Sequence, residues 1–146
     1  MEKTFTLQEA NSLIPKIAGI FDEISALSGR ADDINRDIEN LLSIWGDELF
    51  DSMHIDNKYY EQKVKERTAL AKELHENIEK IHETGAIVKD IGKGLVDFYF
   101  NAPSGPVLLC WKSGESEILY WHTIESGLPG RRPIAELLNA PVPRTD

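Results

Sequence analysis

A heptad pattern of apolar residues fills the first third of the chain and constrains its fold more than any other feature. From Ile17 onward the steps between these residues alternate between three and four, and the phase passes through Gly29 unbroken. This spacing places one apolar stripe along an α-helix. TLQE at Thr6–Glu9 is typical of a capping box, whereas Pro15 predicts a kink or a looser first turn. We therefore predict one long helix, or two nearly collinear ones, with this stripe: Leu13, Ile17, Ile20, Ile24, Leu27, Ala31, Ile34, Ile38, Leu41 and Trp45.

A second helix is predicted after residues 46–57, which lose the heptad phase and contain turn-forming residues. Its end is predicted at Gly85. Arg67 occupies one seam position, where its guanidinium is expected to reach solvent or pair with a carboxylate. Residues 1–86 are thus predicted to form a long antiparallel, coiled-coil-like hairpin. The second seam is Tyr60, Val64, Arg67, Ala71, Leu74, Ile78 and Ile81.

The period of the pattern changes from helical to two after Ala86, which predicts strands. The segments AIVKD, LVDFYF, VLLCW and EILYWH are separated by turn-forming residues. We predict an α+β protein in which residues 87–146 form an antiparallel meander of three to four strands. A Gly- and Pro-rich loop, a short helical turn at residues 135–140 and an extended tail at 141–146 follow. The length of 146 residues favours a single domain, 1–146.

The composition restricts the class of protein. The formal net charge is −9, of which −8 falls on residues 1–87, so we expect no nucleic-acid binding and no association with anionic membranes. The chain has no apolar run that could span a bilayer and no secretory signal. Its single cysteine, Cys110, cannot form an internal disulfide. We therefore expect a cytoplasmic protein.

The strand register determines which polar residues meet on the meander. A two-residue turn at Ser113–Gly114 would pair Leu109 with Ile118, and a turn within NAPSG would pair Phe100 with Pro106. Cys110 then lies on a core face with Phe98, Leu119 and Trp121, away from cationic groups, as a small buried hydrophobe. Asp97 and His122 share the other face. Glu115 and His122 point to opposite faces, about 20 Å or more apart.

Seven polar residues around the meander are candidate ligand-binding residues. One interpretation is structural: an ion pair between Asp97 or Asp90 and an arginine. The other is a pocket in which His122, Arg131 and Arg132 hold an anionic ligand against glycine-rich backbone. No phosphate loop, HExxH motif or nucleophilic GxSxG serine supports a specific reaction. The candidates are Lys89, Asp90, Asp97, Glu115, His122, Arg131 and Arg132.

Two further arrangements could bind a divalent metal ion. His122 could meet Glu115 of another subunit in a dimer. Alternatively, His75, Glu79 and His82 are spaced four and three apart on one face of the second helix. A solvated polar stripe is the usual explanation of the second pattern, and the sequence identifies no fourth ligand.

One set of motifs extends through the second half of the chain: Lys89 and Asp90, Gly94 to Phe98, Cys110 and Trp111, Gly114 and Glu115, Trp121 and His122, and Gly130 and Arg131. This combination resembles the pattern of a bacterial family known only as domain of unknown function 2203. The opening FTLQEANSLIP is similar to the start of that family as well, so the resemblance spans most of the chain. Tyr99 departs from the pattern, which has proline there. The resemblance implies a bacterial, cytoplasmic protein, but it points to no particular activity.

Two functions follow from these features. The first is a non-enzymatic protein that self-associates or binds a protein partner, with a homodimer formed through the helical seam or a sheet face. The alternative is a small module that binds a divalent metal or an anionic ligand around the meander and His122, with hydrolysis included. We favour the first, the non-enzymatic interaction protein, because a fold alone implies no chemistry.

Overall fold

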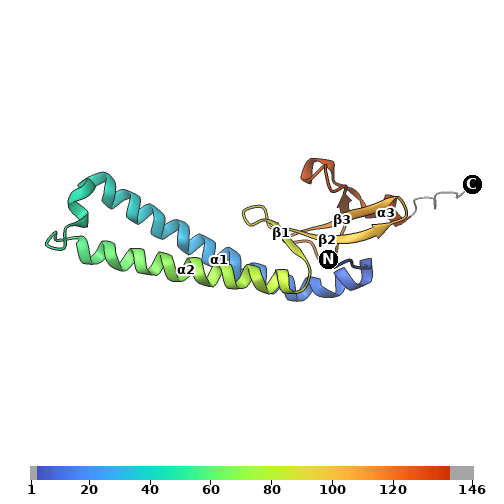
Figure 1. Cartoon of the computed structure of the whole chain (residues 1–146), viewed down its shortest axis with the longest axis horizontal. Coiled ribbons are helices and arrows are strands. Elements are labelled where there is room, and N and C mark those ends of the chain that lie inside the picture. The colour runs from blue at the N-terminus through green and yellow to red at the C-terminus, as the bar shows by residue number, and fades with distance from the viewer. Residues whose placement is uncertain (1–2, 139–146) are drawn as a thin grey trace, which may run out of the picture. The chain divides into compact units, whose positions relative to one another are not determined.

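The computed structural model describes residues 3–138 of the chain (Figure 1). Its elements belong to the α+β class, as predicted: two long helices, an antiparallel meander and a short final helix. Two compact units are distinguished, one containing residues 3–22 and 78–138 and the other Glu23–Asn77. The single domain stays a prediction. In the described part of the chain, no helix is long and apolar enough to cross a membrane.

Both predicted long helices are present. Helix α1 spans Leu7–Trp45 without interruption at Pro15 or Gly29, which confirms a single long helix. Its capping box is formed as predicted, because Thr6 N–H donates to Glu9 Oε1 and Glu9 N–H donates to Thr6 Oγ1, each at 3.0 Å. A 3₁₀ helix, η1 at Gly46–Phe50, follows, and then α2 spans Asn57–Glu83.

The unit Glu23–Asn77 is a helical hairpin with its own apolar core. Leu27, Ile34 and Ile38 of α1 are buried against Leu70 of α2. The seam predicted for α1 is therefore used within the chain, except at its last position, Trp45, which is exposed. Dimerisation through the seam stays a prediction. In α2 one predicted position is wrong: Ala71 is exposed and Leu70 is buried. The partly buried residues around this core are Ala31, Leu42, Tyr60, Val64 and Leu74.

The described residues form five strands in the order β1-β2-β3-β4-β5, with every neighbouring pair antiparallel. The meander is confirmed, with one short strand more than the three to four predicted. That strand lies in the segment predicted as a loop. The tail predicted at 141–146 lies outside the described residues. The elements are β1 Ile87–Asp90, β2 Leu95–Ala102, β3 Gly105–Lys112, β4 Tyr120–His122, η2 Leu128–Gly130, β5 Arg132–Pro133 and α3 Ile134–Leu138.

The predicted register is wrong in both central hairpins. Phe100 pairs with Val107 instead of Pro106, a slip of one residue. Leu109 pairs with Trp121 instead of Ile118, a slip of three residues. Because both slips are odd, they exchange the two faces of the sheet for the residues concerned.

The second slip arises because residues 113–119 form a wide loop in place of a two-residue turn. The Glu115 carboxylate accepts a hydrogen bond from Lys112 N–H at 2.6 Å, which turns the chain early. Ile118 N–H then donates to Asn11 Oδ1 of α1 at 2.8 Å. These contacts hold Glu115–Ile118 away from strand pairing. Leu119, predicted in the core, is exposed.

One face of the sheet, called the apolar face below, carries Val96, Phe98, Leu109 and Trp111, all buried. Helix α1 and the segment before it cover this face. Phe5 packs edge-on against Phe98, with ring centroids 5.3 Å apart, and Phe21 packs against Trp111 at 6.2 Å. The opposite face, called the site face, carries Asp97, Leu108, Cys110 and His122, which are buried as well.

Candidate metal centre

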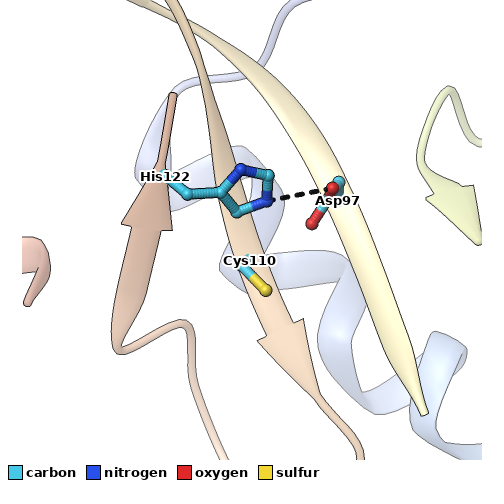
Figure 2. Close-up of side chains that lie close together, drawn as sticks. All are labelled: Asp97, Cys110 and His122. Atoms are coloured by element: carbon cyan, nitrogen blue, oxygen red, sulfur yellow. Dashed lines mark hydrogen bonds and ion pairs between the residues drawn. The ribbon is translucent and has the colours of Figure 1, made fainter. Parts of the chain in front are cut away.

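Three adjacent strands bring Asp97 of β2, Cys110 of β3 and His122 of β4 together on the site face (Figure 2). Asp97 pairs directly with Cys110, and His122 pairs with Leu108, two residues along β3. The ligand atoms of the three side chains lie within 4.8 Å of one another. Within residues 3–138, this is the only group of three such side chains close enough to hold a metal ion.

All three side chains are buried: Asp97 is 1% exposed, Cys110 2% and His122 4%. They form part of the wall of a pocket of about 150 Å³. The rest of the wall is mainly apolar, with one cationic residue, Lys89, at a bulge in β1. A pocket of this size accommodates several waters or a small ligand. Its other lining residues are Leu95, Leu108, Ile124 and Gly127.

Both ring nitrogens of His122 are engaged. Nδ1 lies 2.7 Å from the backbone oxygen of Thr123, and Nε2 lies 3.1 Å from Asp97 Oδ2. The carbonyl oxygen can only accept, so Nδ1 carries a hydrogen and donates it. Nε2 then either donates to the carboxylate from an imidazolium or accepts from a protonated Asp97. The same Nδ1–H contact to a backbone carbonyl is the one that orients metal-binding histidines and directs Nε2 at the ion.

Asp97 is a buried carboxyl group with incomplete hydrogen bonding. Burial raises its pKa above the ordinary value, although attraction to His122, a contact with the Cys110 thiol and the charge of Lys89 oppose this rise. No described residue donates a hydrogen bond to its Oδ1 atom. A buried carboxylate oxygen without a donor or cation is costly, so it indicates a missing partner.

Cys110 lies between these two residues. Burial raises the pKa of its thiol to about 12, helped by the negative charge of Asp97 and opposed by Arg131. The thiol is therefore protonated near neutral pH and is not an activated nucleophile. A metal ion would displace this proton, because thiols coordinate as thiolates. The prediction that Cys110 is buried is confirmed, but the prediction that it lies away from cationic groups is wrong, because Arg131 is close enough to oppose the rise of its pKa.

Glu115 and Arg131, two of the predicted ligand-binding residues, contact each other at a different place. Arg131 Nη2 donates to Glu115 Oε1 at 3.1 Å and Oε2 at 3.3 Å, and the guanidinium lies 4.2 Å from the Tyr120 ring centroid. The Glu115 backbone oxygen accepts a hydrogen bond from Trp111 Nε1 at 2.7 Å. These contacts fasten the 113–119 loop to the sheet. Whether Glu115 meets His122 of another subunit stays a prediction.

The remaining candidates of the meander are separated. Arg132 is exposed, with its guanidinium 5.7 Å from the Trp121 ring centroid. Asp90 Oδ1 accepts from Lys93 N–H at 2.8 Å and stabilises the turn after β1. The predicted ion pair of Asp97 or Asp90 with an arginine is thus wrong, because Asp97 pairs with His122. Of the seven candidates, the pocket brings together Lys89, Asp97 and His122.

The helical alternative of His75, Glu79 and His82 lies on α2, where all three are exposed. His82 Nε2 accepts a hydrogen bond from Val88 N–H at 3.2 Å, and its Nδ1 lies 3.6 Å from Glu79 Oε1. One ring nitrogen of His82 is therefore used to hold the end of α2 to β1. The ligand atoms of His75, Glu79 and His82 do not lie close enough together to share one ion, so metal binding by them would require side-chain movement and stays a prediction.

Sequence reasoning missed Cys110 as a site residue, because the slipped register placed it on the wrong face. One signal was available in the sequence. Asp97 and Cys110 are both interior positions of strands with apolar neighbours on each side. Polar side chains at such positions, on adjacent strands, can meet across a single ladder.

Comparison with known proteins assigns the chain to a family. No curated protein and no solved structure matches it. A family model described as "Uncharacterized conserved protein (DUF2203)" matches residues 3–134, which include the whole candidate metal centre. The chain therefore belongs to the DUF2203 family.

Proposed function

We propose that this protein binds a divalent transition-metal ion through Asp97, Cys110 and His122, and that Zn²⁺ is the ion. One carboxylate, one thiolate and one imidazole form a mixed ligand set. Thiolate and imidazole suit Zn²⁺, whereas Mg²⁺ and Ca²⁺ prefer sites made of oxygen atoms alone.

The observation that carries this proposal is the unsatisfied Oδ1 of Asp97, buried beside His122 Nε2 and the Cys110 thiol. A protonated Asp97 donating to Nε2 would satisfy Oδ2 and the imidazole, but it would leave Oδ1 without a partner. A cation bound between the three side chains gives the carboxylate its counter-charge and uses the Nε2 lone pair.

The distances are compatible with a tetrahedral ion after a small adjustment. Zinc bonds of about 2.0–2.3 Å require ligand atoms about 3.3–3.8 Å apart. Asp97 Oδ2 and His122 Nε2 are 3.1 Å apart and would separate slightly, and no pair of ligand atoms among the three side chains exceeds 4.8 Å. Side-chain shifts of about 1 Å at most would bring every pair into this range, and such shifts cost at most a small rotamer adjustment.

Three protein ligands leave a fourth coordination position. In zinc proteins that position is open in catalytic sites and is occupied by water or substrate. Here it would face the pocket, where Lys89 is the cationic neighbour. The proposed function is therefore a metal-binding module whose fourth ligand is water or a small anion.

Metal analysis of untagged protein tests this proposal. We expect about one zinc ion per chain, either after purification or after the protein is stripped with a chelator and reloaded with Zn²⁺. Loading with Co²⁺ should produce a thiolate-to-cobalt charge-transfer band. Cys110 is the only cysteine in the chain, so the band can come from no other residue. Cys110→Ser should abolish it, and His122→Ala should weaken metal affinity by more than about 100-fold.

His75→Ala is the matched control, because His75 is an exposed histidine outside the cluster and also belongs to the helical alternative. It should leave both the metal content and the cobalt band unchanged. Circular dichroism of each variant separates loss of metal from loss of fold. Folded wild-type protein that takes up no zinc and shows no cobalt band would refute the proposal.

A further inference from the structure

The turn between the two long helices carries an unusual concentration of exposed apolar side chains. We call residues 44–59 the hairpin tip. Of the nine large hydrophobic side chains that are exposed among those the structure describes, six lie in the hairpin tip. Met53 and Ile55 are 87% and 86% exposed, and Ile44 is 68% exposed. Single exposed apolar residues are ordinary, but a cluster of this kind marks a binding surface. The other three are Trp45, Phe50 and Tyr59.

The hairpin tip is held in shape by contacts of its own. Trp45 Nε1 donates to Asp56 Oδ2 at 2.8 Å, and the Trp45 ring packs against His54 with centroids 4.6 Å apart. Leu49 is fully buried, and its backbone oxygen accepts from Asn57 Nδ2 at 2.9 Å. The turn is thus fixed from inside while its apolar side chains point outward. A surface ordered in advance loses less conformational entropy on binding.

The charge of the hairpin tip indicates what it can bind. It contains four acidic residues and one lysine. Asp47, Glu48 and Asp51 are exposed beside the apolar side chains. An anionic lipid surface or a second hairpin tip of the same charge would be repelled. A partner with lysine and arginine around an apolar centre is complementary in both respects.

We propose that the hairpin tip is a docking surface for a basic, amphipathic protein segment or surface. Its exposed apolar residues fill the centre of the contact, and the acidic residues pair with basic groups at its rim. This inference is independent of the metal site, since no residue of the hairpin tip belongs to that site.

A pair of synthetic helical peptides tests the proposal on the full-length protein. The first has leucine on one face and lysine on the other, and its twin has glutamate in place of every lysine. Isothermal titration calorimetry should show that the lysine peptide binds at least about tenfold more tightly than its twin, with an affinity that falls as salt rises.

Two sets of variants locate the binding surface. Met53→Ser with Ile55→Ser should weaken binding of the lysine peptide at least about tenfold, whereas Leu119→Ser, an exposed apolar residue elsewhere, should not. Asp47→Lys combined with Glu48→Lys should weaken binding of the lysine peptide and reduce its salt dependence. The control Glu76→Lys, at an exposed position of α2, should have a smaller effect on both. Substitutions at exposed positions are expected to leave the fold intact.

Three results would overturn the proposal. The first is equal binding of the two peptides or an equal effect of Leu119→Ser. The second is stronger binding to phosphatidylglycerol–phosphatidylcholine vesicles than to the peptide, which would indicate a membrane surface. The third is self-association in light scattering that the Met53→Ser, Ile55→Ser variant abolishes, which would make a second copy the occupant.

Discussion

The two faces of the sheet are built from alternate residues of the same strands, and both are buried, but they are filled differently. On the apolar face, Phe98 and Trp111 contact Phe5 and Phe21 in edge-to-face aromatic pairs. Their sequence neighbours Asp97 and Cys110 point to the site face and meet His122. Burial alone therefore does not separate residues that stabilise the fold from the residues that we propose bind a metal ion; the chemistry of the contacts does.

Burial of the aromatic residues on the apolar face and burial of Asp97 on the site face change the free energy of unfolding in opposite directions. Burial of aromatic side chains on the apolar face stabilises the folded state. Burial of a carboxylate on the site face costs free energy unless a cation or hydrogen-bond donors compensate. We therefore expect the apolar face to stabilise the folded state and the buried Asp97 carboxylate to lower that stability when no cation is bound. This difference can be tested one face at a time.

Phe98→Ala should have the largest effect, because Phe98 is fully buried against Phe5. We expect a loss of about 3–5 kcal/mol in the free energy of unfolding, measured by urea denaturation. Phe98→Leu, which refills most of the space, should lose clearly less. The residual folded fraction should still bind metal. A loss below about 1 kcal/mol would mean that the apolar face is not the main source of stability.

Asp97→Asn should separate the two faces most sharply. It should weaken metal affinity by more than about 100-fold, because it removes a ligand charge. With a metal chelator present, the free energy of unfolding of Asp97→Asn should equal that of the wild type or exceed it by up to about 1 kcal/mol. Burial already raises the pKa of Asp97 and disfavours its charged form, so a neutral asparagine should be tolerated at this position. A destabilisation above about 2 kcal/mol would show that Asp97 serves the fold.

Glu115→Gln tests whether the edge of the site is structural. The Glu115–Arg131 pair is largely buried, so we expect a loss of about 1–2 kcal/mol in the free energy of unfolding. Metal affinity should change by less than about threefold, because neither residue lines the pocket. The exposed Glu117→Gln is the matched control. A fall in affinity as large as that of Asp97→Asn would place Glu115 in the metal site.

The helices, the meander and the capping box could be predicted, because each depends on a pattern that is local in the sequence. The seam that packs Ile34 and Ile38 follows helical spacing, and the capping box at Thr6 follows a four-residue motif. The exposure of Ala71 shows the limit of such patterns, since Leu70 fits the seam equally well.

The site could not be predicted, because it depends on register. The alternation of apolar and polar residues fixes the strand register when one face of a sheet is polar. Here both faces are largely apolar, so more than one register would bury apolar side chains. The loop before β4 is set by contacts with distant residues: Ile118 with Asn11, and Glu115 with Arg131. No local pattern encodes these pairs. Asp97 and His122 were therefore recognisable as candidates on one face, but Cys110 was not, and neither was the cluster of all three.

Glu9→Gln should produce the smallest effect, and it tests how far the apolar face depends on the start of α1. Hydrogen bonds from Thr6 lower the pKa of Glu9 below its ordinary value of 4.5. For a carboxyl group with a lowered pKa in the folded state, the stabilisation is fully present above the unfolded value and is lost as pH falls through the folded value.

Wild-type protein should accordingly be more stable than Glu9→Gln near pH 6, and the difference should shrink as pH falls below about 4.5. Urea midpoints of metal-free protein at several pH values would measure it, with exposed Glu23→Gln as the control. Glutamine can still accept the Thr6 N–H, so the variant isolates the charge at the helix N-terminus. Because Phe5 lies next to this cap and packs on Phe98, weakening the cap should loosen the apolar face and leave metal affinity unchanged. A fall in metal affinity would mean that the two faces are coupled through α1 and are not independent.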